Sequence, residues 1–285
     1  MPWTLSHPAV VLPLRRFSPR PLDFAALVLG SMTPDLGYYI NRFDLTTFAH
    51  TLPGSFVACL PSGLLFMVVF YLFCKPICYA LSTPHRQVLL PLCPAFPTTL
   101  GRWAIILLSL LLGAWTHNFW DAFTHEDGWF VLRIPWLRQQ VVQLSTINVC
   151  VYLVLQEVST VVGFAILAVA YWRWLGRQPS KEANDSQSDG WRYLFWGAVA
   201  TMSLLFGYPA AARYAEAASA HGFLFFRCIL FRTAVYAPQI AVPLSLVATA
   251  VIYARRQRPT EGGPRNGTMS PPGIARYEER ASKKN

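Results

Sequence analysis

Five long apolar runs constrain this chain more than any other feature of its sequence. Each has about 20 mostly apolar residues, the length that an α-helix needs to cross the hydrocarbon core of a bilayer. The runs lie near residues 55–73, 103–120, 149–171, 193–212 and 233–253. They are continuous and do not alternate in polarity, which favours helices over a membrane β-barrel. We therefore predict an all-α, polytopic membrane protein with about five transmembrane helices.

The composition excludes the main alternatives to this class. Charged residues make up 13% of the chain, whereas ordinary soluble domains carry roughly 25%. The net charge is +10. In a membrane protein, such a basic excess reflects topology and attraction to lipid headgroups before nucleic-acid binding. The partner that we expect is thus the lipid bilayer and not a nucleic acid.

The two ends of the chain differ from its apolar middle. In residues 1–54, the apolar stretch Phe24–Gly30 is too short to cross a bilayer, so we predict an interfacial or re-entrant helical segment. No basic residue precedes the first apolar run, which argues against a signal peptide. From residue 255 onward the chain is rich in Gly, Pro, Arg and Lys, which predicts a disordered basic tail over 255–285. Residues 1–254 then form a single membrane domain.

Basic residues in the short loops predict the orientation, because Lys and Arg are enriched on the cytoplasmic side. The tail, the loop after the third span and the loop after the first span hold most of them. With five spans, all three of these segments share one side, which we predict to be cytoplasmic. The N-terminal segment and the loop after the second span then lie on the outer face.

A group of ionisable residues closes the second apolar run. His117, Asp121 and His125 follow one another at intervals of four residues, so one face of a helix presents all three. Imidazole and carboxylate are typical zinc ligands, and ionisable residues near the bilayer are costly and usually functional. The alternative without a metal is a hydrogen-bonded His–Asp pair at a helix end. The spacing is compatible with a metal site without being diagnostic of one.

Three more residues fall on the same membrane face under the predicted topology. They are His7 near the N-terminus, Asp35 in a turn after Pro34, and His50 directly before the first span. A metal site needs ligands at one depth, and this arrangement supplies them. The metal-ligating candidates are therefore His7, Asp35, His50, His117, Asp121 and His125, with zinc as the expected cofactor.

Several other residues that could take part in chemistry have more than one possible role. Glu157, about two turns into the third span, could be a further ligand, an acceptor for a ligand's N–H, or a protonated acid between helices. The Trp and Tyr residues, Tyr38 included, mostly flank the spans and indicate an aromatic belt. The six Cys are scattered, and Cys74-x3-Cys78 has no second pair, so we expect buried small side chains and no cysteine zinc site.

Four segments together resemble a known family. They are Met1–Pro13, Leu27–Asp35, His50–Gly54 and Gly113–His125. Their residues and their order resemble a family of uncharacterised bacterial membrane proteins known as domain of unknown function 4184. This resemblance implies a multi-pass protein of the bacterial inner membrane. On the orientation predicted from the loops, the C-terminal tail lies in the cytoplasm and the site on the outer face.

The same order of motifs is similar to that of inner-membrane metal-dependent hydrolases and, more distantly, of the zinc phospholipase C and nuclease superfamily. That resemblance implies one metal on Asp35, His50, His117 and Asp121, and a second on His7 and Asp121. His125 would belong to a third ligand group. The superfamily's His-x3-Glu pair is missing here, so Glu157 would have to supply that carboxylate.

Two functions from different classes follow from these patterns. The first is a membrane-embedded zinc hydrolase acting on phosphoesters or lipids, with Asp121, His125 and Glu157 as candidate catalytic residues. The second is a non-enzymatic membrane protein, an ion or proton transporter or a structural protein, that uses the same polar cluster. No phosphate-binding loop and no nucleophile elbow of a serine hydrolase occurs in the chain.

Overall fold

The computed structural model describes residues 3–144, 147–179, 189–218 and 221–257. The chain divides into two units, Met1–Tyr253 and Ala254–Asn285, and every contact discussed below lies within the first. From residue 258 onward, the predicted tail lies outside the described residues.

Five helices within the described ranges are long and apolar enough to cross a membrane, which confirms the predicted helical membrane fold. The first spanning segment, Leu52–Ala80, is built from α5 (Leu52–Gly54), a π-helical turn (Ser55–Cys59) and α6 (Leu60–Ala80). The other four long helices are α8 (Leu100–Thr124), α9 (Val151–Leu175), α10 (Gly190–Ala217) and α11 (Gly222–Gln257). All five end beyond the predicted bounds and all but α9 also begin before them, because the helices continue into their polar flanks.

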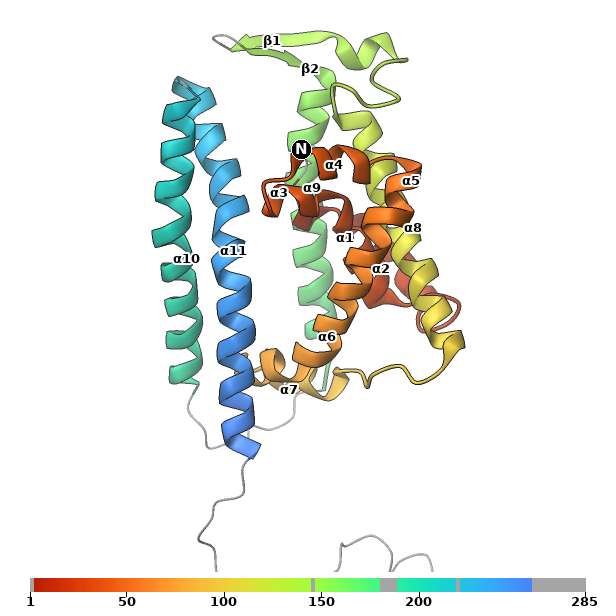
Figure 1. The fold of residues 1–285 in the computed structure, drawn as a ribbon, viewed down its shortest axis with the longest axis vertical. Helices are drawn as coiled ribbons and strands as arrows, with labels where there is room; N and C mark the ends of the chain where they lie inside the picture. The colour runs from red at the N-terminus through yellow and green to blue at the C-terminus, as the bar shows by residue number, and fades with distance from the viewer. Residues whose placement is uncertain (1–2, 145–146, 180–188, 219–220, 258–285) are drawn as a thin grey trace, which may run out of the picture. The chain divides into compact units, whose positions relative to one another are not determined.

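Contacts at the helix ends show that the long helices alternate in direction (Figure 1). The Tyr79 ring at the end of α6 lies 5.7 Å from the Tyr253 ring near the end of α11, and Arg192 at the start of α10 donates to the Tyr79 carbonyl. At the opposite end, Arg227 near the start of α11 pairs with Glu157 near the start of α9. This agrees with the predicted grouping of the loops on two sides. The assignment of one side to the cytoplasm stays a prediction.

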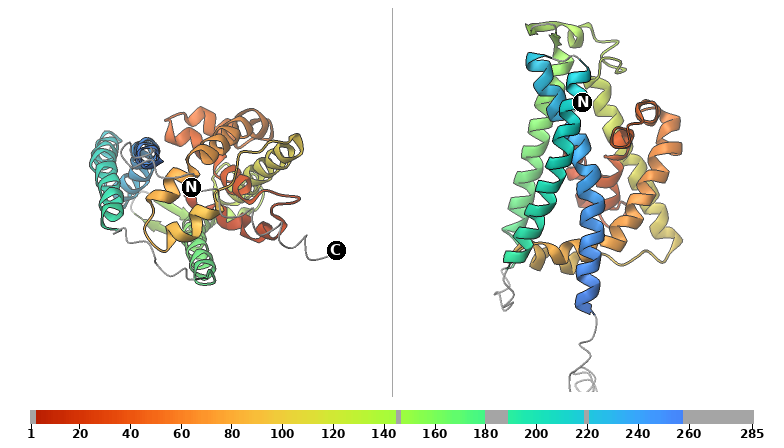
Figure 2. Two further views of the ribbon diagram at one scale, coloured as in Figure 1. Left: turned by 90° about the horizontal axis from the view of Figure 1, so that it is seen from below. Right: turned by 60° about the vertical axis from the view of Figure 1, so that its left-hand side comes forward.

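The N-terminal segment forms short helices that pack inside the bundle. They are η1 (Thr4–Ser6), α1 (Pro8–Val11), η2 (Leu12–Phe17), α2 (Phe24–Gly30), η3 (Thr33–Asp35), α3 (Leu36–Tyr39) and α4 (Phe43–Ala49). The Asp23 carboxylate caps α2 by accepting the Ala26 N–H at 2.8 Å. Two views show these short helices beside α6 and α8 (Figures 1 and 2). Of the two predicted arrangements, this position corresponds to a re-entrant segment.

Small residues let α2 approach the middle of α8 closely. A Cβ added at Gly30 would meet the Leu110 backbone, and one added at Gly113 would meet the carbonyl of Leu27 and, at 2.7 Å, the N–H of Ser31. The buried side chains of Ala26, Met67, Ile106 and Leu110 complete this contact. Such close backbone approach is how helices associate where lipid removes the hydrophobic driving force.

One part of the secondary structure was not predicted. Antiparallel strands β1 (Gln140–Leu144) and β2 (Ile147–Cys150) pair directly before α9. The predicted start of the third span at residue 149 was therefore wrong, since Val149 and Cys150 belong to β2 and the helix begins at Val151. Short apolar runs with β-branched residues fit a strand as well as a helix, so their periodicity could not separate the two. The remaining short helices are α7 (His85–Leu89), η5 (Leu90–Leu92) and η6 (Pro135–Arg138).

The close contact of α2 with α8 predicts a position-dependent effect of alanine on α8. We expect Gly113→Ala to lower the free energy of unfolding by about 1–3 kcal/mol, because the new methyl group has no room against the α2 backbone. Gly101→Ala in the same helix meets no atom within 4 Å and serves as the control, with unchanged or slightly higher stability. Thermal unfolding of the two variants in detergent measures the difference. Equal melting temperatures would contradict the packing.

Candidate metal centre

Four residues that are distant in the sequence meet at one end of the bundle. Asp35 ends η3, His50 follows α4, and His117 and Asp121 lie one turn apart on α8. One potential ligand atom from each lies within 4.8 Å of the other three. Asp35, His117 and Asp121 are buried, whereas the His50 side chain is 22% exposed. These are four of the six predicted metal ligands.

Backbone carbonyls orient both imidazole rings. The Nδ1 atom of His117 lies 2.8 Å from the carbonyl oxygen of Ser31, and the Nδ1 atom of His50 lies 2.8 Å from that of Thr46. A carbonyl oxygen can only accept a hydrogen bond, so each Nδ1 carries the proton. In a neutral ring the Nε2 atom is then unprotonated, and its lone pair is free to bind a cation. Metal-binding histidines typically have this second hydrogen bond.

Both Nε2 atoms point at carboxylates. The Nε2 atoms of His117 and His50 each lie 3.2 Å from Oδ2 of Asp121. They lie 3.5 Å and 3.8 Å, respectively, from Oδ1 of Asp35. Lone pairs of neutral imidazoles and carboxylates repel each other at such distances, so the arrangement requires positive charge between them, as a proton or as a metal ion. Two nitrogen and two oxygen donors around two negative charges suit a divalent cation.

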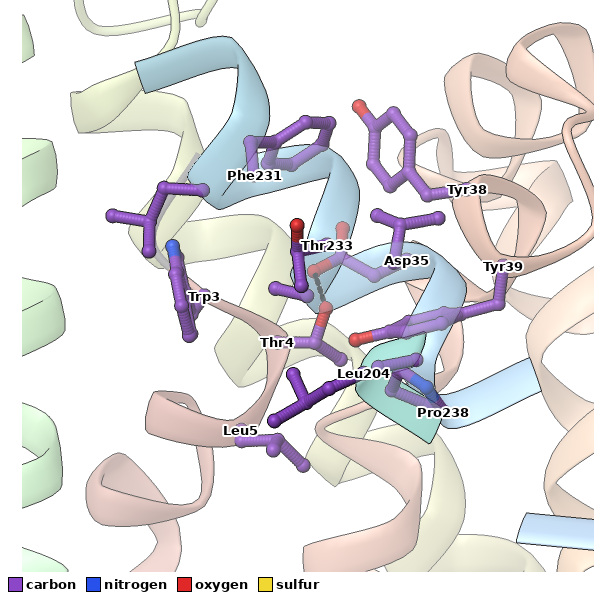
Figure 3. Close-up of a pocket in the computed structure, with 14 residues that line it drawn as sticks. Trp3, Thr4, Leu5, Asp35, Tyr38, Tyr39, Leu204, Phe231, Thr233 and Pro238 are labelled. Carbon is purple, nitrogen blue, oxygen red and sulfur yellow. Dashed lines mark hydrogen bonds between the residues drawn. The ribbon is translucent and has the colours of Figure 1, made fainter. Parts of the chain in front are cut away.

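Hydrogen bonding and burial determine the protonation states of Asp35 and His7, which lie outside the long helices. The Thr4 hydroxyl donates to Oδ2 of Asp35 at 2.6 Å, as the dashed line in Figure 3 shows. Burial raises the pKa of Asp35, but the facing His117 and His7 outweigh it and the net shift is downward. Burial, with a contribution from His117, lowers the pKa of His7 to about 3. An ionised carboxylate and a neutral imidazole are the forms that bind metal.

His7 and His125, the other two predicted ligands, flank this group. The His7 ring stacks on that of His117 with 3.6 Å between centroids, and its Nε2 lies 3.6 Å from Oδ1 of Asp121. The Nδ1 atom of His125 lies 3.1 Å from the backbone carbonyl of Asp121. Both nitrogens of His7 and Nε2 of His125 are buried without a hydrogen-bond partner. Orphaned buried nitrogens of this kind are further potential ligands, and their burial is costly without one.

Glu157 lies elsewhere. Its carboxylate pairs with the Arg227 guanidinium at 3.0 Å, and its side chain is 54% exposed. Among the contacts of the described residues, none joins Glu157 to the four clustered residues, so its predicted catalytic role gains no support from the structure. Tyr38, which the sequence placed in an aromatic belt, lies beside the cluster and lines two cavities there.

Two cavities border the cluster. The first, of about 460 Å³, is lined by polar groups that include His50, Asp121, His125 and Arg133. The second, of about 300 Å³, is almost wholly apolar. Figure 3 shows it between Trp3, Thr4 and Leu5 of the N-terminal segment, Tyr38 and Tyr39 of α3, and Phe231 and Pro238 of α11, with Asp35 at its wall. Tyr38 lines both cavities, so they adjoin at this residue.

These features define a helical membrane protein with a buried His–Asp cluster that could hold a metal ion. The chain belongs to the family described as domain of unknown function (DUF4184), whose model matches residues 1–254. This finding confirms the resemblance to that family. No curated protein and no solved structure matches the chain.

The cluster predicts a metal content that depends on its ligands. We expect the His117→Ala, Asp121→Ala double variant to lose at least one equivalent of transition metal relative to the wild-type protein, because it removes two of four donors. Elemental analysis by plasma mass spectrometry of detergent-purified protein measures this, and size-exclusion chromatography checks folding. His221→Ala changes an exposed histidine and should retain the full metal content. Equal metal content in a well-folded double variant would refute the assignment.

Proposed function

We propose that the protein is a membrane-embedded, metal-dependent hydrolase that binds zinc at this cluster and acts on an amphipathic phosphoester. The observation that carries the proposal is the pair of imidazoles whose Nδ1 atoms face backbone carbonyls while their Nε2 atoms face two buried carboxylates. A buried group with this charge and these free donor atoms is costly unless a cation joins it.

The residues divide into roles by position. Asp35, His50, His117 and Asp121 would hold one metal, and His7 with the other oxygen of Asp121 would hold a second. When bound, zinc supplies a Lewis acid that polarises a phosphoryl oxygen and activates water. His125 has a neighbouring carbonyl at Nδ1 and a free Nε2, and it lines the polar cavity. It is placed to hold or move a proton there, as a general acid or base requires.

The two cavities support the substrate class. A phosphoester head fits the polar cavity, where Arg133 supplies a positive charge for an anion. An alkyl chain fits the apolar cavity, whose wall includes α11 residues of a membrane-spanning helix. The phosphoester head and the alkyl chain of the substrate would meet at Tyr38. An amphipathic substrate is therefore favoured over a wholly soluble one. The proposed setting is the bacterial inner membrane, with the site on the outer face and the tail in the cytoplasm.

Transport of ions or protons is the weaker alternative. A transport path needs polar groups along the depth of the membrane. On α8, no charged residue or histidine lies between Arg102 and His117. Glu157, the acid that favoured transport in the sequence, pairs with Arg227 and is half exposed.

The proposed chemistry predicts metal-dependent hydrolysis by the full chain in phospholipid vesicles. We expect phosphoester cleavage that a chelator abolishes and added zinc restores. Asp121→Asn should lower kcat by at least about 10³-fold, because it removes several kcal/mol of metal-dependent stabilisation of the transition state. His221→Ala should keep wild-type activity. The proposal fails if hydrolysis survives both the chelator and Asp121→Asn.

The apolar cavity predicts that selectivity for chain length can be altered separately. Ala234 lines this cavity, so Ala234→Trp should fill it and raise KM for long-chain phosphoesters by about 10-fold or more, the value of a few lost methylene contacts. KM for a short-chain phosphoester should not change. Val247→Trp on the same helix is the control, because Val247 is 64% exposed and does not line the cavity. An equal rise in KM for the long-chain and the short-chain phosphoester would contradict the assignment of this cavity to the alkyl chain of the substrate.

A further inference from the structure

A second cluster of metal-binding side chains lies outside the site described above. The Sγ atoms of Cys74, Cys78 and Cys93 all lie within 4.8 Å of one another, with 2.8 Å between those of Cys74 and Cys93. The sequence led us to expect scattered small buried side chains and no cysteine metal site, whereas the structure brings three of the cysteines together. The Cys74-x3-Cys78 pair has a third member, which comes from a different segment.

The fold explains how the third thiol reaches the other two. Cys74 and Cys78 lie one turn apart on α6, so they share one face of the helix. After α6 the chain turns back through α7 and η5, both of which contact α6, and Cys93 follows η5 directly. The ring of Phe96 then packs on Tyr71 of α6 and on Trp103 of α8, at 5.3 and 5.7 Å between centroids. Packed elements thus hold all three sulfur atoms in place.

From this geometry we propose that Cys74, Cys78 and Cys93 form a second metal site, which binds one thiophilic cation, Cu(I) or Zn(II). Its three sulfur donors, without imidazole or carboxylate, are the set that selects soft metals. Sulfur atoms that each bind zinc at about 2.3 Å lie about 4 Å apart, so the three thiols need shifts of only about 1 Å to close on one ion. Each thiol that binds gives up its proton to solvent.

Burial and position are compatible with entry of an ion. Cys78 is buried, whereas Cys74 and Cys93 are half-buried, so one side of the cluster is accessible. Ser55 begins the π-helical turn a few residues after His50, and about 20 residues of helix separate it from Cys74. At 1.5 Å per residue, this corresponds to about 30 Å. The two clusters therefore lie at opposite ends of the same spanning segment. On the predicted orientation this end is cytoplasmic, where thiols stay reduced.

The test uses the full-length protein, reduced and freed of metal in detergent. Titration with Co(II) reports thiolate ligands through charge-transfer absorption in the near ultraviolet, which the His–Asp cluster cannot produce. Competition with Zn(II), and with Cu(I) held by a copper(I) chelator under anaerobic conditions, then gives the affinities and identifies the preferred ion. We expect one equivalent of thiolate-bound metal per chain.

Two variants and one control decide the outcome. Cys93→Ser and Cys74→Ser should each weaken binding more than about 100-fold, because loss of a residue that merely orients a ligand already costs about 10–100-fold. Cys150→Ser changes a half-buried cysteine on β2 and should bind as the wild type does. Size-exclusion chromatography confirms that the variants are folded.

Three results would overturn the proposal. The first is a reduced, folded protein with no thiolate charge-transfer band. The second is equal affinity in Cys93→Ser, Cys150→Ser and the wild type. The third is a Cys74–Cys93 disulfide, detected by peptide mass spectrometry, that persists when the protein is prepared with reductant and metal.

Discussion

Two buried carboxylates that share two imidazoles are the interaction on which the rest of this structure depends. Asp35 and Asp121 bring two negative charges into the bundle, and isolated buried charges cost far more than a single fold can offset. The nearby donors His117 and His50 are oriented by backbone carbonyls so that their free nitrogens meet those charges. A divalent cation at this position would balance the charge and satisfy all four side chains at once. Without positive charge at this point, the close packing around it would be strained.

The packing of the N-terminal segment against α8 brings Asp35 to His117. Gly30 and Gly113 allow α2 to lie directly against the α8 backbone, which brings the following turn with Asp35 beside His117. The Ser31 carbonyl that orients His117 belongs to the same turn. The residues that allow the close approach of the helices therefore also set the positions of the clustered side chains.

Much of this could be predicted from the sequence because the strongest signals are local. The interval of four residues between His117 and Asp121 is a property of any helix, and the lengths of the apolar runs determine the number of spans. Asp35 and His50 could be added through the topology, which places them at the same face. Ser31 and Thr46 could not, because they act through their carbonyls and no side-chain pattern marks a carbonyl. The β1–β2 hairpin was missed since its apolar residues merge with the following helix, and Glu157 was overvalued because Arg227 is distant in the sequence.

For the cysteines, the sequence undervalued a possible site, because contacts between distant segments cannot be read from spacing. A metal site made of two close pairs is visible from spacing, whereas Cys93 joins Cys74 and Cys78 only because the chain folds back after α6. Once both clusters are placed, their chemistry distinguishes them. The His–Asp cluster offers nitrogen and oxygen, and the cysteine cluster offers sulfur alone, so the cysteine cluster has the stronger preference for soft cations. About 30 Å of helix separates the two clusters, so a metal bound at one would make no direct contact with the other. The spanning segment Leu52–Ala80 connects the two clusters, because it begins two residues after His50 and carries Cys74 and Cys78 on α6.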